Sequence, residues 1–350
     1  MQLTTAAKSR FEMDDLLERG RALIEESIGF GVTHMRAFVE VDPGVGMKCL
    51  EAGLLLKDEF EDRCFVQICV FAQDPIFTCP DGGEAMRALL EEAAMRPGVD
   101  AIGSTPYVET IRDYHQLNFF FTTNLAKKYK LHLDFHIDYN LDPKQRSVVL
   151  EVIQYLHARG WPSSPNSPDY RTIVFGHCTR LTLFDTNEWL DLREKVRGLP
   201  ISFVGLPTSD LFMMGRPNEG SGGGERPRGT LQVPQMIEKY GFNAAIGINN
   251  VGNAFTPQGS CDPLRLASFG VGIYQAGTKK DAEVLLECVS SRAKTAIGVR
   301  SFPLEEGSPG DFVVFHTGNE SFRSRKSVQE LLYDPPHDRT TIFNGRVVSQ

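Results

Sequence analysis

Short runs rich in valine, isoleucine and phenylalanine alternate along this chain with amphipathic helical patterns, and this alternation constrains the fold more than any other feature. The strand-like runs are 34–41, 64–72, 100–107, 131–138, 172–178, 201–207 and 243–249. The helical patterns are 47–60, 83–94, 117–129 and 281–298. Repeated strand–helix units predict an α/β fold with a parallel sheet. A TIM-type (β/α) barrel typically has eight strands, so one strand is not identified here.

The pattern changes after about residue 300, which predicts a barrel over 1–300 and a small β appendage over 301–350. Within the appendage, 311–316 and 340–350 are strand-like, and Asn344-Gly345 is a hairpin turn signal. A Gly-rich, charged loop over 215–229 follows a predicted strand, on the side where barrel active sites form. It is either a mobile lid over the site or a tolerated disordered insertion.

Composition excludes several classes of function. Hydrophobic residues make up 41% of the chain and charged residues 23%, as in soluble globular proteins. No apolar run approaches the ~20 residues of a membrane span, and the first twenty residues lack a secretory signal. The net charge of −8 and the scattered basic residues argue against a nucleic-acid partner. Seven cysteines without a C-x-x-C pair indicate reduced, buried thiols and a cytoplasmic location.

The run 131–138 carries the most chemical information. Because strand side chains alternate, His132, Asp134, His136 and Asp138 share one face, and the apolar residues between them share the other. The apolar face is expected to pack on the helices, so the four ionisable groups point into the barrel. Such groups are costly there unless they are paired, metal-bound or catalytic. We predict acid–base roles for His136 and Asp138 near the strand end, and a hydrogen-bonded core position for His132.

Other predicted strands also end in polar residues. His177 ends the run 172–178, close to His136 on the neighbouring strand, and two imidazoles suit metal ligation or proton transfer. Gln73 directly follows the run 64–72, where its amide either reads the edge of a cyclic amide or amidine or caps a loop. The last two runs are followed by further polar candidates, namely Ser209, Asp210, Asn249 and Asn250.

At these residues the chain resembles bacterial cytosine deaminases and their relatives in the amidohydrolase superfamily, including fungal cytosine-deaminase-like hydrolases. The motifs occur in order as GVTHMRAFVEVD, VFAQDPIF, LDFHIDYN, GHCTR, FVGLPTSDLFMMGR and GINNVGNAFTP, and the tail as GDFVVF and TTIFNGRVV. The resemblance implies a metal-dependent hydrolase on a TIM-type barrel with a partial β-sandwich at the C-terminus. It implies that Gln73 binds the substrate base, that His136 is a metal ligand, and that His177 lies near substrate.

The departures from this pattern concern the metal. The family's first strand ends in His-x-His, which occurs nowhere in this chain, so that strand is predicted to be missing. Phe38 stands where the family has an inward histidine, Tyr139 where it has a proton-shuttling acid, and Asn249 and Asn250 where it has acidic residues. His136 is then the single retained ligand position. A hydrolytic metal site needs about three protein ligands. Zinc or iron is therefore expected only if the missing ligands come from elsewhere.

Two interpretations follow. The first is a hydrolase of a C–N bond in a small cyclic amide or amidine, with a degenerate metal site. Its predicted catalytic residues are His136, Asp138, His177 and Asn249, and its predicted substrate-binding residues are Gln73, Tyr139, Ser209, Asp210 and Asn250. The alternative is a catalytically inactive or truncated protein of this fold, a pseudoenzyme or small-ligand binder. In either case the partner is a small molecule, and the open edges of a seven-stranded barrel favour a homo-oligomer.

Overall fold

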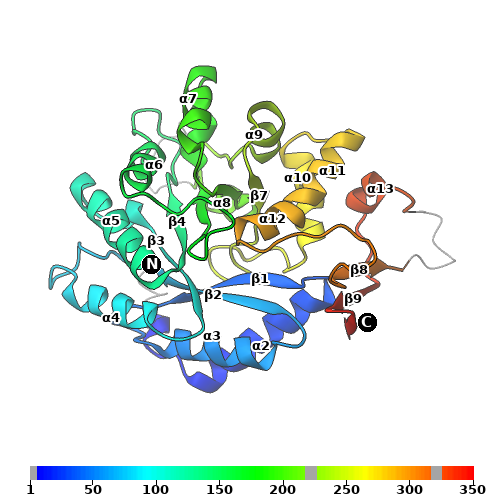
Figure 1. The fold of residues 1–350 in the computed structure, drawn as a ribbon, viewed down its shortest axis with the longest axis horizontal. Coiled ribbons are helices and arrows are strands. Elements are labelled where there is room, and N and C mark those ends of the chain that lie inside the picture. The colour runs from blue at the N-terminus through cyan, green and yellow to red at the C-terminus, as the bar shows by residue number, and fades with distance from the viewer. Residues whose placement is uncertain (1–5, 217–226, 317–324) are drawn as a thin grey trace.

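The structure, a computed structural model, describes residues 6–216, 227–316 and 325–350. Seven strands form one parallel sheet in which each strand pairs with the next along the chain. They are β1 (His34–Glu40), β2 (Phe65–Ala72), β3 (Val99–Ser104), β4 (His132–Ile137), β5 (Ile173–His177), β6 (Ile201–Gly205) and β7 (Ala244–Ile246). The sheet curls into a half-barrel with helices around its outside (Figure 1). All seven predicted runs are confirmed as strands, and within the described residues no strand pairs with the outer edges of β1 and β7.

Most of the helices pack around the outside of the sheet. The helices are α2 (Met13–Gly29), α3 (Lys48–Glu59), α4 (Glu84–Ala94), α5 (Arg112–Tyr129), α6 (Val149–Ala158), α7 (Thr186–Val196), α8 (Pro207–Met213), α9 (Val233–Tyr240), α10 (Pro263–Ile273), α11 (Lys279–Cys288), α12 (Ser291–Ala296) and α13 (Val328–Tyr333). Of these, α8 lies at the site described below, and α13 packs on α10 and α11. Two short 3₁₀ turns, Pro106–Val108 and Thr179–Leu183, follow β3 and β5. Local sequence explains several helix starts: Asp185 and Glu188 form a capping box at α7, which satisfies backbone N–H groups that the helix leaves open.

The predicted division of the sheet into an apolar outer face and a more polar inner face is confirmed on β4. Leu133, Phe135 and Ile137 are buried in the main hydrophobic core together with residues of α5 and α6. Burying each such side chain contributes roughly 1.5–3 kcal/mol relative to leaving it exposed. The alternate residues of β4 face the barrel interior, and this arrangement places its histidines in the site described below.

The predicted helix over 281–298 is confirmed only in part, because the structure divides it into α11 and α12. Ser290 lies between α11 and α12 with φ −131° and ψ −99°, outside the helical region. Its hydroxyl donates a hydrogen bond to the carbonyl of Leu286 at 2.7 Å, a competing bond known to bend helices. The break lets the end of α12 reach the barrel: the carbonyls of Ala296 and Ile297 accept hydrogen bonds from Thr172 and Gln67.

A small antiparallel sheet ends the chain, as predicted. It consists of β8 (Phe312–Phe315), β9 (Arg339–Phe343) and β10 (Arg346–Ser349), in the order β10-β9-β8. Asn344 and Gly345 join β9 to β10 with φ values of +50° and +74°. Two consecutive positive φ angles are what a two-residue hairpin requires, and Asn-Gly adopts them at little cost.

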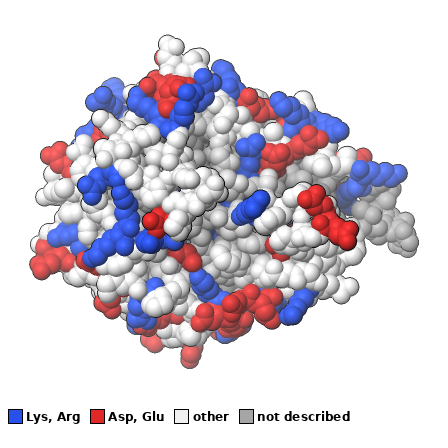
Figure 2. All heavy atoms as spheres, viewed as in Figure 1, with Lys and Arg blue, Asp and Glu red and all other residues white. Residues whose placement is uncertain are grey.

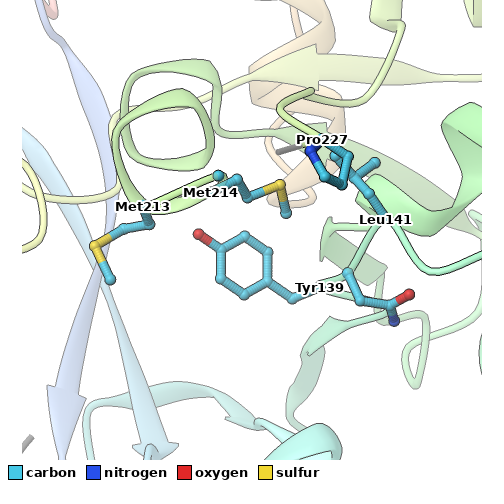
Figure 3. Close-up of a pocket in the computed structure, with 7 residues that line it drawn as sticks. Tyr139, Leu141, Met213, Met214 and Pro227 are labelled. Carbon is cyan, nitrogen blue, oxygen red and sulfur yellow. The ribbon is translucent and has the colours of Figure 1, made fainter. Parts of the chain in front are cut away.

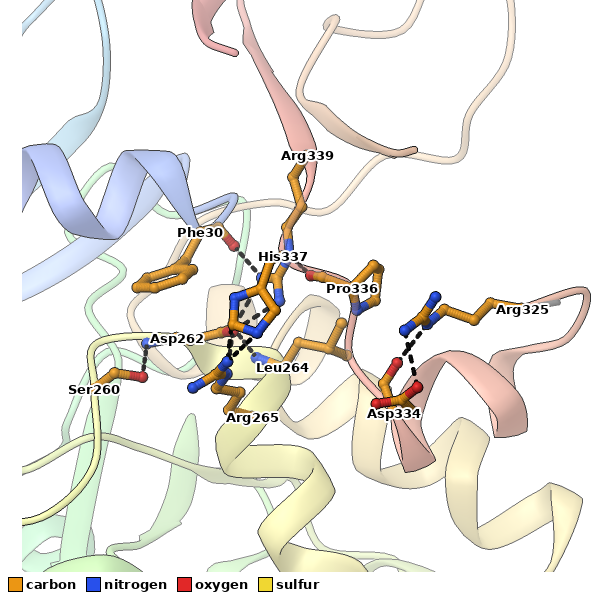
Figure 4. Close-up of polar contacts among 10 residues, drawn as sticks. All are labelled: Phe30, Ser260, Asp262, Leu264, Arg265, Arg325, Asp334, Pro336, His337 and Arg339. Carbon is orange, nitrogen blue, oxygen red and sulfur yellow. Dashed lines mark hydrogen bonds and ion pairs between the residues drawn. The ribbon is translucent and has the colours of Figure 1, made fainter. Parts of the chain in front are cut away.

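A buried ion pair attaches this small sheet to the barrel (Figure 4). The two guanidinium Nη atoms of Arg339 donate to the two carboxylate oxygens of Asp262, which precedes α10, at 2.8 and 2.7 Å. Arg339 also donates to the carbonyl of Phe30, just after α2, at 2.9 Å. Both charged side chains are at most 1% exposed. A bidentate pair of this kind fixes orientation as well as distance, so β9 is held against α2 and α10 together.

Basic and acidic side chains are interspersed around the face shown in Figure 2, and the centre of that face is mostly uncharged. Among the described helices, none has the length and apolar character needed to cross a bilayer. Of the predicted loop 215–229, residues 217–226 lie outside the described residues, so the lid hypothesis stays a prediction.

Candidate functional site

His136 lies inside the half-barrel among aromatic rings. Its ring centroid is 4.6 Å from that of Phe71, 5.4 Å from that of Phe38 and 5.0 Å from that of His177. Gly176 makes room for it, because a Cβ at that position would approach the His136 ring to 2.8 Å. Burial, with a smaller contribution from His177, lowers the pKa of His136 well below its ordinary value. His136 is therefore a neutral imidazole at physiological pH.

His177 is held by a fully buried carboxylate. Its Nδ1 lies 2.7 Å from Oδ1 of Asp210, on the buried side of α8, and Asp210 is 0% exposed. The second oxygen of Asp210 accepts a hydrogen bond from the Thr230 hydroxyl at 2.7 Å. His177 itself has a φ of +63°, a left-handed conformation that is uncommon outside glycine and concentrates at functional sites. Because Asp210 fixes the proton on Nδ1, Nε2 of a neutral His177 is left as a base.

The structure therefore places Asp210 differently from the predicted substrate-binding role. Both of its oxygens have partners within the protein, and its side chain has no exposed surface for a ligand to contact. Thr230 was not among the predicted residues. It follows the Gly-rich segment in the sequence, and no local pattern marks it as a partner of α8.

Asp138 is also not in the position that strand alternation predicts. β4 ends at Ile137, and Asp138 has a φ of +53°, so it leaves the inward face. Its carboxylate accepts hydrogen bonds from the Ser147 hydroxyl and from the backbone N–H groups of Val148 and Val149, the latter two at 2.8 and 3.4 Å. Asp138 thus caps the start of α6, where a negative charge also favours the helix dipole.

A polar chain fills the barrel interior below the two histidines. Arg36 donates to Asp134 at 2.7 Å and to the side-chain oxygen of Gln67 at 2.7 Å. Burial raises the pKa of Asp134 to about 6, and the charge of Arg36 opposes this shift. Asp134, which was predicted to point into the barrel, is therefore paired with Arg36. Arg36 was missed, although its alternation with Phe38 along 34–40 was a usable signal.

Two tyrosines and a glutamine form the polar side of the site. The Tyr139 ring centroid is 4.2 Å from that of His177 and 5.8 Å from that of Tyr107. Burial raises the pKa of Tyr107 to about 12, and a hydrogen bond with Gln73 opposes this shift. Burial also raises the pKa of Tyr139. Both phenols stay protonated near neutral pH, which makes Tyr139 a hydrogen-bond donor rather than a base.

The loop after Gln73 is held by Glu109, which sequence reasoning also missed. The Glu109 carboxylate accepts from the backbone N–H groups of Ile76, Phe77 and Thr78 at 2.7, 3.1 and 2.9 Å. A buried carboxylate with this many donors fixes the loop that leads out of β2.

The predicted asparagines lie beyond β7. Asn249 donates to the Ser209 hydroxyl at 3.1 Å, and that hydroxyl donates to the carbonyl of Leu206 at 3.2 Å. Asn249 and Ser209 are thus paired with each other beside α8. Asn250 accepts from Asn253 at 2.9 Å and lines a separate cavity of about 400 Å³ together with Phe269 of α10.

The residues present do not match a hydrolytic metal site. Throughout the described ranges, no three histidine, cysteine, aspartate or glutamate side chains converge in a way that would hold an ion. The side chain beside His136 on β1 is Phe38, an apolar ring, and Asp210 is already engaged by His177. About three protein donors are needed to retain a catalytic divalent ion. No step is therefore assigned to a metal here.

A cavity opens next to Tyr139 (Figure 3). It has a volume of about 270 Å³ and is lined by Tyr139, Asn140, Leu141, Met213, Met214, Gly215 and Pro227. Since the Tyr139 ring also contacts His177, this cavity adjoins the histidine–aspartate pair.

The chain has the fold of hydrolases that act on C–N bonds. No family model matches it. A curated relative, the N-isopropylammelide isopropyl amidohydrolase of Pseudomonas sp. (strain ADP), is 23% identical over 330 residues, which are 91% of this chain and 69% of the relative. A 5-methylcytosine deaminase from Klebsiella pneumoniae, liganded with 5-fluorocytosine, superimposes with a TM-score of 0.82 and 23% identity over 98% of this chain and 77% of its own.

A second solved structure supports the same assignment. The N-isopropylammelide isopropylaminohydrolase from Burkholderia multivorans ATCC 17616 gives a TM-score of 0.74 and 21% identity over 94% of this chain and 74% of its own. The predicted resemblance to cytosine-deaminase-like amidohydrolases is confirmed, and with it the class of the relatives, which are enzymes that cleave C–N bonds.

Proposed function

We propose that this protein hydrolyses a C–N bond in a small cyclic amide or amidine, using His177 as its acid–base group. The observation that carries the proposal is the hydrogen bond of 2.7 Å between His177 and the fully buried Asp210. A carboxylate in this position orients the imidazole and stabilises its protonated form, which is how histidine bases are prepared in other hydrolases.

The other side chains supply recognition. Gln73 and Tyr107 form the hydrogen-bonding edge that a planar amide or amidine ring needs, because an amide side chain both donates and accepts. Phe38 and Phe71 supply ring faces beside His136. Flat rings stack on such faces, so the site favours a small planar substrate.

The reaction needs only water as co-substrate. The oxygen of a water molecule adds to the ring carbon while Nε2 of His177 accepts the water proton, and the electron pair of that carbon's double bond moves onto the nitrogen or oxygen at its other end. This pair then restores the double bond as the C–N bond breaks, and His177 returns its proton to the leaving nitrogen. The ring carbon ends with oxygen in place of nitrogen, and the nitrogen leaves as a neutral amine or ammonia. Asp210 keeps its charge throughout and compensates that of the transient imidazolium.

The test is turnover of a panel of cyclic amides and amidines by the purified chain, before and after chelation, with His177→Asn and Asp210→Asn beside His157→Asn, which removes an imidazole from α6. We expect C–N hydrolysis that survives chelation, is lost in the first two variants and persists in the third. Stoichiometric zinc or iron together with loss of turnover on chelation would overturn the metal-independent mechanism. If the well-folded protein hydrolyses no member of the panel, the inactive or ligand-binding alternative is correct.

A further inference from the structure

A second cavity lies beyond β7, between α8 and α10. Its volume of about 400 Å³ falls within the range of ~300–1,000 Å³ that small-molecule sites occupy. Its walls come from the first turn of α8, the segment after β7 and the start of α10, all within the described residues. Figure 4 shows three of its lining residues, Ser260, Asp262 and Arg265, close to one another. Neither His177 nor Asp210 lines it, so it is distinct from the site of the proposed reaction.

Part of the lining is apolar. Ile248 follows β7, and Leu266 and Phe269 lie three residues apart on one face of α10. Leu266 is buried, whereas Phe269 is 47% exposed. The Phe269 ring therefore leaves apolar surface at the cavity, and a bound apolar group that covers it gains from the transfer out of water.

The polar part of the lining offers hydrogen-bond donors. The Thr208 hydroxyl is buried and has no hydrogen-bond partner in the described ranges. The Ser260 oxygen accepts a backbone N–H at 3.3 Å, and the Asn250 side-chain oxygen accepts another amide at 2.9 Å, which leaves the hydroxyl proton of the first and the N–H groups of the second for a ligand. Gln258 donates to the carbonyl of Thr208 at 3.2 Å, so its own oxygen is left as an acceptor. Three donors against this acceptor favour a ligand that accepts hydrogen bonds.

The charge at the cavity is positive. Asp262 is the acidic side chain of the lining, and its two oxygens accept from Arg339 at 2.8 and 2.7 Å, so Arg339 compensates its charge. Arg265 adds a second guanidinium, with Nε 3.6 Å from the same carboxylate and an Nη atom in contact with the ring of His337. The Arg265 side chain is 46% exposed and thus open to a ligand. Two guanidinium groups share one carboxylate here, and a further negative charge would complete the pairing.

We infer that this cavity binds a small organic carboxylate. Its negative group pairs with Arg265 and accepts a hydrogen bond from the Ser260 hydroxyl, while its apolar body covers Phe269 and Leu266. A guanidinium matches the geometry of a carboxylate, which it can bind through two parallel hydrogen bonds. An inorganic anion would leave the apolar wall uncovered, and a neutral amide would leave the second guanidinium without a charge partner. This binding is a function separate from the proposed C–N hydrolysis.

The experiment measures the binding of three probes to the purified chain by isothermal titration calorimetry. The probes are phenylacetate, phenylacetamide, which keeps the ring and lacks the charge, and acetate, which keeps the charge and lacks the ring. We expect phenylacetate to bind at a single site about tenfold or more tightly than either of the others, because a charged hydrogen bond and the burial of a ring each contribute at least that factor. Equal affinity for phenylacetate and phenylacetamide, or no saturable binding of phenylacetate, would overturn the inference.

Variants test where the carboxylate binds. Arg265→Gln and Phe269→Ala should each weaken phenylacetate binding about tenfold, and Arg265→Lys, which keeps the charge, should weaken it less. Two matched controls should keep the native affinity. They are Arg193→Gln, whose side chain on α7 is also 46% exposed, and Phe302→Ala, whose ring is 48% exposed. Thermal unfolding of each variant, with a Tm close to that of the native chain, establishes that it is folded.

His177→Asn separates this site from that of the proposed reaction. It should bind phenylacetate with the native affinity. Weakened binding in His177→Asn together with native affinity in Arg265→Gln would place the anion at the histidine–aspartate pair and refute the inference. Equal weakening in Arg265→Gln and Arg193→Gln would show an effect of net charge alone and refute it as well. Because the readout is binding, a failure to find C–N hydrolysis has no effect on this result.

Discussion

Asp138 and Asp210 are both buried carboxylates near the C-terminal ends of the parallel strands, but their partners differ in kind. Asp138 accepts from two backbone N–H groups and the Ser147 hydroxyl at the start of α6. Asp210 accepts from the side chains of His177 and Thr230, and within the described residues no backbone N–H donates to it. A backbone N–H cannot change its protonation state, whereas an imidazole can.

This difference in partners separates a carboxylate that stabilises the fold from one that acts on a catalytic side chain. A carboxylate bound to the first turn of a helix satisfies donors that would otherwise stay unpaired, and its loss affects stability. A carboxylate bound to an imidazole controls which nitrogen carries the proton, and its loss affects turnover. Residue type and burial are alike at the two positions, so the partner alone makes the distinction.

The largest expected effect is that of Asp210→Asn. We expect kcat to fall about 10³-fold, because the orientation and charge compensation of a histidine base are lost and general acid–base catalysis contributes roughly 10²–10⁴-fold. Steady-state kinetics on the best C–N substrate measures the fall, and thermal unfolding should show a Tm close to that of the native chain. Retention of more than a tenth of the native kcat would contradict the role given to Asp210.

Asp138→Ala tests the carboxylate that is bound to the start of α6 and is expected to stabilise the fold. We expect the free energy of unfolding to fall by about 2 kcal/mol, because the cap of α6 is removed and the Ser147 hydroxyl and backbone donors lose their acceptor. Urea denaturation followed by circular dichroism measures the loss. Kinetics corrected for the folded fraction should show far less change than Asp210→Asn. A kcat loss as large as that of Asp210→Asn would place Asp138 in the chemistry after all.

Thr230→Val sharpens the comparison by removing one partner of Asp210 and keeping the shape of the side chain. The hydrogen bond of 2.7 Å to Oδ2 disappears, while the bond from His177 to Oδ1 remains. Since a hydrogen bond to a charged group is worth roughly 1.5–3 kcal/mol but solvent and neighbours compensate in part, we expect a loss of about tenfold in kcat. An unchanged kcat would restrict Thr230 to a packing role.

The sequence predicts the sheet well and the site only in part, for a physical reason. Strand position and the inner or outer face of His136 follow from period-two alternation, which is local. The alternation fails one residue past β4, because the positive φ of Asp138 depends on contacts with α6 that the strand does not encode. His177 was predicted as a site residue, but its partner is 33 residues further along the chain, on a different element.

The missed residues show the same limit. Arg36 lies on a strand whose alternation could have revealed it, as the inward neighbour of Phe38. Glu109 and Thr230 lie on irregular segments, where no periodicity assigns a direction to a side chain. The assignment of partners to buried polar groups therefore needs tertiary structure, even where the fold class does not.

His132 extends the comparison to an imidazole that is bound to the backbone. Its Nδ1 accepts the N–H of Thr172 at 2.9 Å, so the neutral form is required, and burial together with Arg36 and Arg171 lowers its pKa to about 3. In the unfolded chain the ordinary value of 6.5 applies. Between these two values the unfolded chain binds a proton that the folded chain does not, so this contribution to stability is complete above pH 6.5 and is lost as the pH falls toward 3. His34, whose pKa burial lowers to about 4, acts in the same direction.

His132→Asn removes the titration while keeping an acceptor near the position of Nδ1. We expect the free energy of unfolding of this variant to fall less steeply than that of the native chain as the pH is lowered from 6.5 to 4.5, measured by urea denaturation at each pH. His157→Asn, which removes an imidazole at the exposed end of α6, is the matched control and should keep the native slope. If the free energy of unfolding of His132→Asn depends on pH as steeply as that of the native chain, the His132 imidazole contributes nothing to acid sensitivity. Its hydrogen bond with the backbone of Thr172 would then not identify His132 as a residue that stabilises the fold.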